Sequence, residues 1–144
     1  MSDPVFPHPR AGHRAGADLG KPSVEVARYT ARIALVSLVG EHDVSTKDSL
    51  LDALARASDQ PCVVVDLSLC TFADSSVVSA LVALDSTGLC FVRLVVPETQ
   101  RAVRRTFELV GMAEFVPVHD SLEEALIEAR EDDAVEESAP EVTS

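Results

Sequence analysis

Hydrophobic and polar residues follow two different periods in the middle of the chain, between residues 23 and 130. Runs rich in valine, leucine and isoleucine predict strands, and stretches in which apolar residues recur every three or four positions predict helices. The predicted strands span 24–29, 33–39, 62–67 and 91–96, with a short edge strand at 115–118. Four helices are predicted: 45–57, 77–84 with its start at 74–76, a third that includes 103–110, and 121–129. This order, β-β-α-β-α-β-α-(β)-α, predicts an α/β fold with a mixed sheet of four to five strands and mostly parallel pairing.

Short polar segments mark where these elements begin and end. Only residues 30–32 separate the first two strands, which should therefore form a hairpin. Residues 45–48 and 121–124 have the spacing of a capping box, in which side chains satisfy free backbone N–H groups at the start of a helix. Gly111 follows the third helix at the position where a left-handed residue commonly ends a helix.

Composition divides the 144 residues into one domain and two tails. Residues 1–22 hold four of the eight prolines and three of the six glycines, which is typical of a disordered arm. Residues 131–144 form an acidic run that we also expect to be disordered. The folded domain is therefore predicted to span 23–130, a length that suits a single hydrophobic core.

The net charge of −12 excludes some classes of partner. A chain this acidic is repelled by phosphate backbones and by anionic lipids, so we expect neither nucleic acid nor a membrane surface as a partner. The sequence has no apolar run of the roughly 20 residues that a membrane span needs, and no signal peptide at its start. We therefore expect a soluble, cytoplasmic protein.

The residues that usually carry catalysis are scattered. His8 and His13 lie in the predicted arm, and His42 and His119 lie in predicted loops, where we interpret them as solvated side chains. Neither the spacing of a metal site, nor a serine-nucleophile motif, nor a glycine-rich phosphate loop is present. We expect no metal ion, no cofactor and no enzyme activity.

The three cysteines, Cys62, Cys70 and Cys90, are too few and too widely spaced for a disulfide scaffold. One interpretation is that they are reduced, buried thiols that behave as small hydrophobic residues. The other is a redox pair, such as Cys70 with Cys90.

Asp66 ends a predicted strand, as does the phosphate acceptor of a phosphorelay receiver. A receiver also needs an acidic pair for Mg²⁺ and a basic residue that steadies the phosphoryl group. The preceding strand ends without paired acids, and no lysine follows Lys47. Asp66 is therefore better interpreted as a structural residue.

Ser75 stands where a strand passes into a helix, in the segment Asp74, Ser75, Ser76. A serine at this position is often the N-cap, because its oxygen satisfies a free backbone N–H group. The same position also suits a phosphate, because the start of a helix offers N–H donors and a partial positive charge. The residues alone leave both interpretations open.

Four segments carry a resemblance when taken in order. They are residues 40–43 (G-E-H-D), 63–68 (V-V-V-D-L-S), 71–76 (T-F-A-D-S-S) and 107–112 (F-E-L-V-G-M), the last followed by 115–126. On these segments the chain resembles the STAS-domain anti-sigma-factor antagonists over about residues 24–129. The resemblance implies a STAS-type mixed sheet.

The resemblance also implies a function. Such proteins bind an anti-sigma factor that is a serine kinase, and thereby release a sigma factor that acts in stress responses. The kinase phosphorylates the serine that follows the signature aspartate, which is Ser75 here, and this switches the antagonist off until a serine phosphatase restores it. Partner-binding residues are then expected at Asp43, Asp74, Ser75, Ser76 and Val77.

Val77 departs from the family, which usually has glycine after D-S-S. Its bulk should hinder the close approach of a kinase. A second D-S-x-G segment at 85–88 follows the second helix, and we interpret it as a turn.

Arg101, Arg104 and Arg105 lie on one predicted helix face and form either a contact for an acidic partner or a solvated surface.

Two other functions stay open. The first is a STAS binding module controlled by thiol oxidation or by partner abundance, without phosphorylation. The second is a phosphorelay receiver or a small hydrolase that uses Asp66.

Overall fold

The computed structural model describes residues 21–138, with side chains described as far as Glu131. Almost all of the predicted arm (1–22) and the end of the predicted acidic tail (139–144) lie outside the described residues. In the described part of the chain, no helix has both the length and the apolar character needed to cross a membrane.

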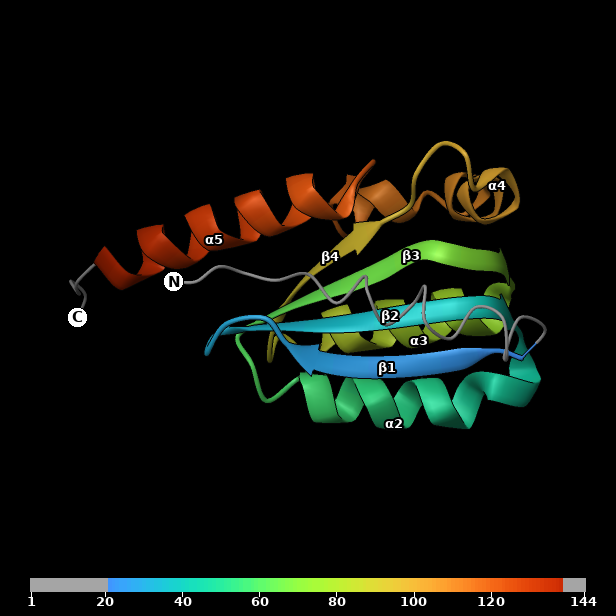
Figure 1. Cartoon of the computed structure of the whole chain (residues 1–144), viewed down its shortest axis with the longest axis horizontal. Coiled ribbons are helices and arrows are strands. Elements are labelled where there is room, and N and C mark those ends of the chain that lie inside the picture. Colours follow the sequence, from blue (N-terminus) through green and yellow to red (C-terminus); the bar gives the residue numbers. More distant parts are fainter. Residues whose placement is uncertain (1–20, 139–144) are drawn as a thin grey trace.

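A five-stranded mixed sheet forms the centre of the molecule, in the order β1-β2-β3-β4-β5 (Figure 1). The first two strands are antiparallel, as the predicted hairpin requires, and all later neighbours are parallel. The strands are β1 (Ser23–Arg28), β2 (Ile33–His42), β3 (Cys62–Ala73), β4 (Phe91–Val95) and β5 (Val118–His119). The predicted fold class and order of elements are confirmed.

Helices cover both faces of this sheet (Figure 1). They are α2 (Lys47–Ala57), α3 (Ser75–Ser86), α4 (Arg101–Leu109) and α5 (Leu122–Ser138), with short 3-10 turns η1 (Val44–Thr46) and η2 (Met112–Glu114). In Figure 1, α2 and α3 lie on one side of the sheet and α5 lies on the other. The chain thus forms three layers.

Alternation along the strands explains why both faces are apolar. On β2, Ala34, Val36 and Leu38 point into the core shared with α2, α3 and α4. Their neighbours Ile33 and Leu35 point the other way and pack with α5. Successive side chains of a strand point to opposite faces, so the near-continuous apolar run is what a doubly covered strand requires.

Two strands are longer than predicted, and both extend at their carboxyl ends. β2 reaches His42 and β3 reaches Ala73, and the two ends pair with each other beyond the last residue that pairs with β4, Asp66. Gly40 makes this extension possible, because its φ is +89° and a side chain there would lie 3.1 Å from the Pro22 backbone.

The predicted caps divide into one error and two confirmations. The capping box at 45–48 is wrong, because Asp43 accepts the Ser45 N–H and a 3-10 turn precedes α2. Ser121 does accept the Glu124 N–H, over 3.1 Å. Gly111 has the expected left-handed backbone, with φ of 68°.

The remaining boundaries differ modestly from the predictions. The edge strand is Val118–His119 rather than 115–118, and α5 continues to Ser138, past the predicted domain boundary at residue 130.

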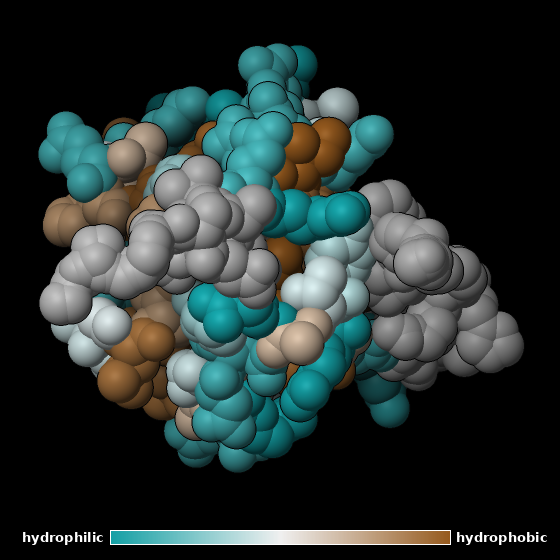
Figure 2. Space-filling model, turned by 90° about the vertical axis from the view of Figure 1, so that its left-hand side faces the viewer, coloured by the Kyte–Doolittle hydropathy of each residue, from teal (hydrophilic) through white to brown (hydrophobic). Residues whose placement is uncertain are grey.

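Figure 2 shows the end of the molecule on the left of Figure 1, which is mostly hydrophilic with separate hydrophobic areas. The carboxyl ends of β2 and β3 lie at the opposite end of the molecule (Figure 1).

Candidate functional site

Two loops meet at the carboxyl ends of β2 and β3. His42 and Ala73 are neighbours in the parallel register, and the Asp74 N–H donates to the His42 carbonyl over 3.3 Å. Asp43 and Asp74 each come directly after one of these paired residues. The sheet therefore holds the two segments side by side, although 31 positions separate them in the sequence.

Both loops begin with the same local device, an Asp-x-Ser turn. In each, one carboxylate oxygen of the aspartate accepts the N–H and the hydroxyl of the serine two residues later: Asp43 from Ser45, at 2.9 and 2.6 Å, and Asp74 from Ser76, at 2.9 and 2.5 Å. Asp66 and Ser68 make a third such turn within β3. The D-x-S spacing occurs at all three places in the sequence, and this repetition is a signal from which the turns could have been predicted.

Ser75 is the first residue of α3, and its side chain is exposed. The interpretation of Ser75 as the N-cap is wrong, because the Asp74 carboxylate has that role. Among the described residues, the Ser75 hydroxyl has no hydrogen-bonding partner. The fold thus leaves a free hydroxyl at the start of a helix.

Val77 lies elsewhere than we expected. Its side chain is 1 % exposed and belongs to the core of the α2–α3 face. It occupies the third position of α3, one of the inward-facing positions that Val78 and Leu81 continue. Its bulk is therefore turned away from the surface, and neither direct contact with a partner nor hindrance of a kinase follows from it.

Three exposed apolar side chains come from the first loop and from the end of β3 that leads to Ser75. Val44 is the middle residue of the first Asp-x-Ser turn and is 72 % exposed. Leu69 and Phe72 are 49 % and 43 % exposed on the part of β3 that extends beyond β4. Single exposed apolar groups are common on protein surfaces, so the exposure of these side chains does not by itself identify a binding surface.

His42 is fully buried, so our interpretation of it as a solvated loop residue is wrong. One ring nitrogen, Nε2, lies 3.0 Å from the Val39 carbonyl, and the other, Nδ1, lies 3.0 Å from the Thr46 hydroxyl. Burial lowers the pKa of His42, because the charged form loses its hydration. The bonds from Ser45 lower the pKa of Asp43, first of all the bond from its hydroxyl, because they stabilise the carboxylate.

All three cysteines are buried thiols, which agrees with the first of our two interpretations. Burial raises the pKa of Cys70 to about 11 and also raises the pKa of Cys90. The thiolate is the reactive form of a cysteine, so burial disfavours the reactive form of both thiols. Regulation by thiol oxidation loses support.

Asp66 is half-buried in β3, where its carboxylate accepts the two bonds from Ser68. These bonds give it a local structural role. The receiver and hydrolase alternatives gain nothing from this arrangement.

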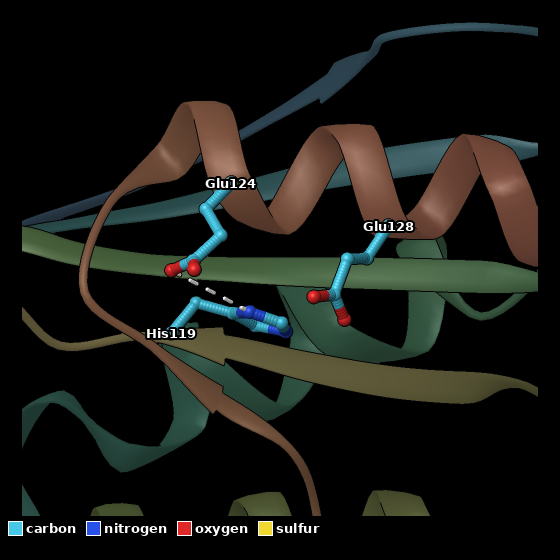
Figure 3. Close-up of side chains that lie close together, drawn as sticks. All are labelled: His119, Glu124 and Glu128. Carbon is cyan, nitrogen blue, oxygen red and sulfur yellow. Dashed lines mark ion pairs between the residues drawn. The ribbon is translucent and has the colours of Figure 1, made fainter.

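A second cluster of titratable residues lies between the sheet and α5 (Figure 3). Glu124 and Glu128 project from α5 toward His119, and the possible ligand atoms of the three residues lie within 4.8 Å of one another. His119 is buried, so our interpretation of it as a solvated side chain is also wrong. The spacing would suit a metal ion.

The hydrogen bonds of Arg93 argue against metal binding by this cluster. Its Nη1 donates to His119 Nε2 over 3.0 Å and to a Glu128 oxygen over 3.2 Å. Since an arginine can only donate, Nε2 is the acceptor, and the proton of a neutral ring is on Nδ1, which faces Glu124 at 4.0 Å. Neither nitrogen offers a free lone pair, so the cluster acts as an internal ion-pair network that joins β4, β5 and α5.

The three arginines of α4 do not act as one face. Arg104 is half-buried and donates to the Val96 carbonyl and, over 2.8 Å, to Asp120, which ties α4 to the segment before α5. Arg101 and Arg105 are exposed. Only these two remain available to a partner.

Comparison with protein-family models gives a match to the family described as "Mlab, STAS domain", over residues 28–128. The chain belongs to the STAS domain family. No curated protein matches this STAS domain significantly.

Solved structures with the same fold include anti-sigma factor antagonists. The antagonist from Mycobacterium paratuberculosis is 25 % identical, with a TM-score of 0.63 over 76 % of this chain and 95 % of that one. The antagonist SpoIIAA in its unphosphorylated form is 17 % identical, with a TM-score of 0.57 over 76 % and 98 % of the two chains. SpoIIAA of Bacillus in its phosphorylated form is also 17 % identical, with a TM-score of 0.54 over 74 % and 99 %.

Proposed function

We propose that this STAS domain is an anti-sigma-factor antagonist that binds an anti-sigma factor of the serine-kinase type and so releases a sigma factor. Phosphorylation of Ser75 switches it off, and a serine phosphatase restores it. In this role the protein is a substrate and a competitor rather than an enzyme. Membership of the STAS family and the likeness to the antagonist from Mycobacterium paratuberculosis support the general role.

The observation that carries the proposal is the exposed hydroxyl of Ser75, the middle residue of the second Asp-x-Ser turn, which has no hydrogen-bonding partner among the described residues. We define the docking surface as Asp43, Val44, Phe72, Asp74 and Ser75. It combines a modifiable hydroxyl with apolar side chains that a partner would cover. Because Asp74 already caps α3, Ser75 is free for modification without loss of the cap.

A phosphate on Ser75 would act on the partner rather than on the fold. It adds about −1.5 to −2 charges at the start of a helix, a position that tolerates negative charge. In a complex, that charge must lose its hydration and lies beside the carboxylates of Asp43 and Asp74. A cost of about 3 kcal/mol would weaken binding more than a hundredfold.

The first test identifies the partner. The parent protein and the variants Ser75→Asp and Ser79→Asp are used to capture proteins from the native cell, and the captured proteins are identified by mass spectrometry. Ser79 is the matched control because it is exposed on α3 one turn further along. We expect an anti-sigma factor with a kinase domain on the parent and on Ser79→Asp, and much less of it on Ser75→Asp.

The second test is chemical. The captured kinase and ATP should add one phosphate to the parent and to Ser79→Ala, and none to Ser75→Ala. A phosphate that persists on Ser75→Ala would show that another residue is the acceptor. If the captured partner has no kinase activity, the result would favour the alternative that this protein is a STAS binding module without control by phosphorylation.

A further inference from the structure

The buried imidazole of His42 connects the two loops of the docking surface. Its side chain bonds to Val39 within β2 and to Thr46 in η1, and its carbonyl accepts the N–H of Asp74. Asp43 comes directly after it in the chain, and the ring is fully buried. A change at this ring therefore has a short covalent or hydrogen-bonded path to both Asp-x-Ser turns.

The hydrogen atoms around the ring can be assigned from chemistry. The Val39 carbonyl can only accept, so Nε2 carries a proton. In the neutral ring, Nδ1 must then accept from the Thr46 hydroxyl. That hydroxyl also lies 3.1 Å from the Asp43 carbonyl, and it has only one hydrogen for the two acceptors.

Protonation of the ring resolves this competition. With a proton on both nitrogens, Nδ1 donates to the Thr46 oxygen, and the hydroxyl hydrogen turns to the Asp43 carbonyl. Every bond then has a donor and an acceptor, so the charged ring has a second complete arrangement. The two arrangements differ in how firmly Asp43 is held.

The charged groups around the ring come from few elements. Asp43 is the charge whose field acts on it, and it favours the protonated form. From β3 the neighbour in register is Ala73, which is apolar, and Asp74 comes next in the chain. From β1, the Ser23 backbone bonds to the ring, and Lys47 at the start of α2 is the nearest base along the chain.

We propose that His42 is a proton-operated positioning residue: protonation reverses its hydrogen bond to Thr46 and shifts both turns of the docking surface, including the backbone at Ser75. This inference rests on the proposed function for its biological meaning. The structural change itself needs neither a kinase nor an anti-sigma factor.

The test is a pH titration of the full chain by NMR, from pH 8 to pH 5, without any partner. We expect His42 to be the Nε2–H tautomer at pH 8 and to protonate with a midpoint below 6.5. The amide resonances of Asp43, Thr46, Asp74 and Ser75 should move with the same midpoint. His42→Gln should abolish these movements, and His119→Gln, which changes the other histidine that is buried in the described part of the chain, should leave them intact.

In the parent protein and in His42→Gln, two outcomes would overturn the proposal. In the first, the amide resonances of Asp74 and Ser75 do not move while His42 titrates. In the second, the same amide resonances move with pH in His42→Gln as they do in the parent. If His42→Gln fails to fold, Thr46→Val keeps the ring and removes its switchable partner. That variant should lower the His42 midpoint and uncouple Asp43 from it. An unshifted midpoint in Thr46→Val would overturn the proposal as well, whatever the phosphorylation assay shows.

Discussion

The two Asp-x-Ser turns at the carboxyl ends of β2 and β3 have the same hydrogen bonds and present different middle residues. Asp43 to Ser45 presents Val44, and Asp74 to Ser76 presents Ser75. Both middle residues are exposed. One backbone device thus displays an apolar side chain on one loop and a hydroxyl on the other, and under the proposed function the first would contact a partner and the second would regulate that contact.

The turns also differ in the helices to which they lead. Asp74 leads directly into α3, a helix of 12 residues whose inner face is in the core. Asp43 leads into a 3-10 turn of three residues, and α2 begins only afterwards, without a side-chain cap. We therefore expect Asp74 to matter more for stability and Asp43 more for the shape of the docking surface.

The largest effect on partner affinity is expected from a phosphate on Ser75, in the second Asp-x-Ser turn. Phosphorylated Ser75 should bind the captured anti-sigma factor at least about a hundredfold more weakly than the unmodified protein, because the phosphate must lose its hydration. Isothermal titration calorimetry on the two forms measures this ratio. Equal affinities would remove Ser75 as the regulatory residue even if it is phosphorylated.

The next largest effect on partner affinity is expected from shortening the side chain of Val44, in the first Asp-x-Ser turn. Val44→Ala should weaken the same complex about tenfold, since burying a valine side chain contributes about 1.5 kcal/mol. The thermal unfolding temperature should not change, because Val44 is mostly exposed in the free protein. Ile127→Ala, an exposed change on α5, is the matched control and should keep the parent affinity.

Removing the two caps compares their structural roles. Asp74→Ala should lower the free energy of unfolding by about 1 kcal/mol, because the first turn of α3 loses its acceptor. Asp43→Ala should cost less, since Asp43 caps only a short 3-10 turn. Urea denaturation at pH 7.5 measures both, and a larger loss in Asp43→Ala would contradict the ranking.

The smallest effect is the contribution of His42 to stability below neutral pH. Because burial lowers its pKa, the folded protein binds fewer protons than the unfolded chain, and this contribution is complete above about pH 6.5. It is lost as the pH falls through the folded pKa. The free energy of unfolding should therefore decline between pH 7.5 and pH 5.5, and less so in His42→Gln.

Local patterns predicted the order of strands and helices, because hydrophobic period and punctuation are local properties. They missed the carboxyl-terminal extensions of β2 and β3, since Gly40 carries no strand signal and is held by the neighbouring strand. The burial of His42 and His119 was missed for the same reason. Each ring lies under groups that are distant in the sequence or face it only after folding.

The site was predicted in part. A strand-to-helix junction and a family resemblance indicated Ser75, and its exposure is what a phosphate acceptor needs. The roles of its neighbours required coordinates, because spacing alone could not decide between Asp74 and Ser75 as the cap. Nor could spacing show that Val77 points inward, which depends on the direction of α3 against the sheet.

The direction of α5 has a practical consequence. The helix starts beside β5 and runs away from the end of the sheet where β2 and β3 finish (Figure 1). A fluorophore or a surface linker attached to its outer side, for example at Ile127, would leave the opposite end accessible to large molecules in solution. Instruments that require an immobilised or dye-labelled protein can thus report encounters at Ser75 without obstructing them.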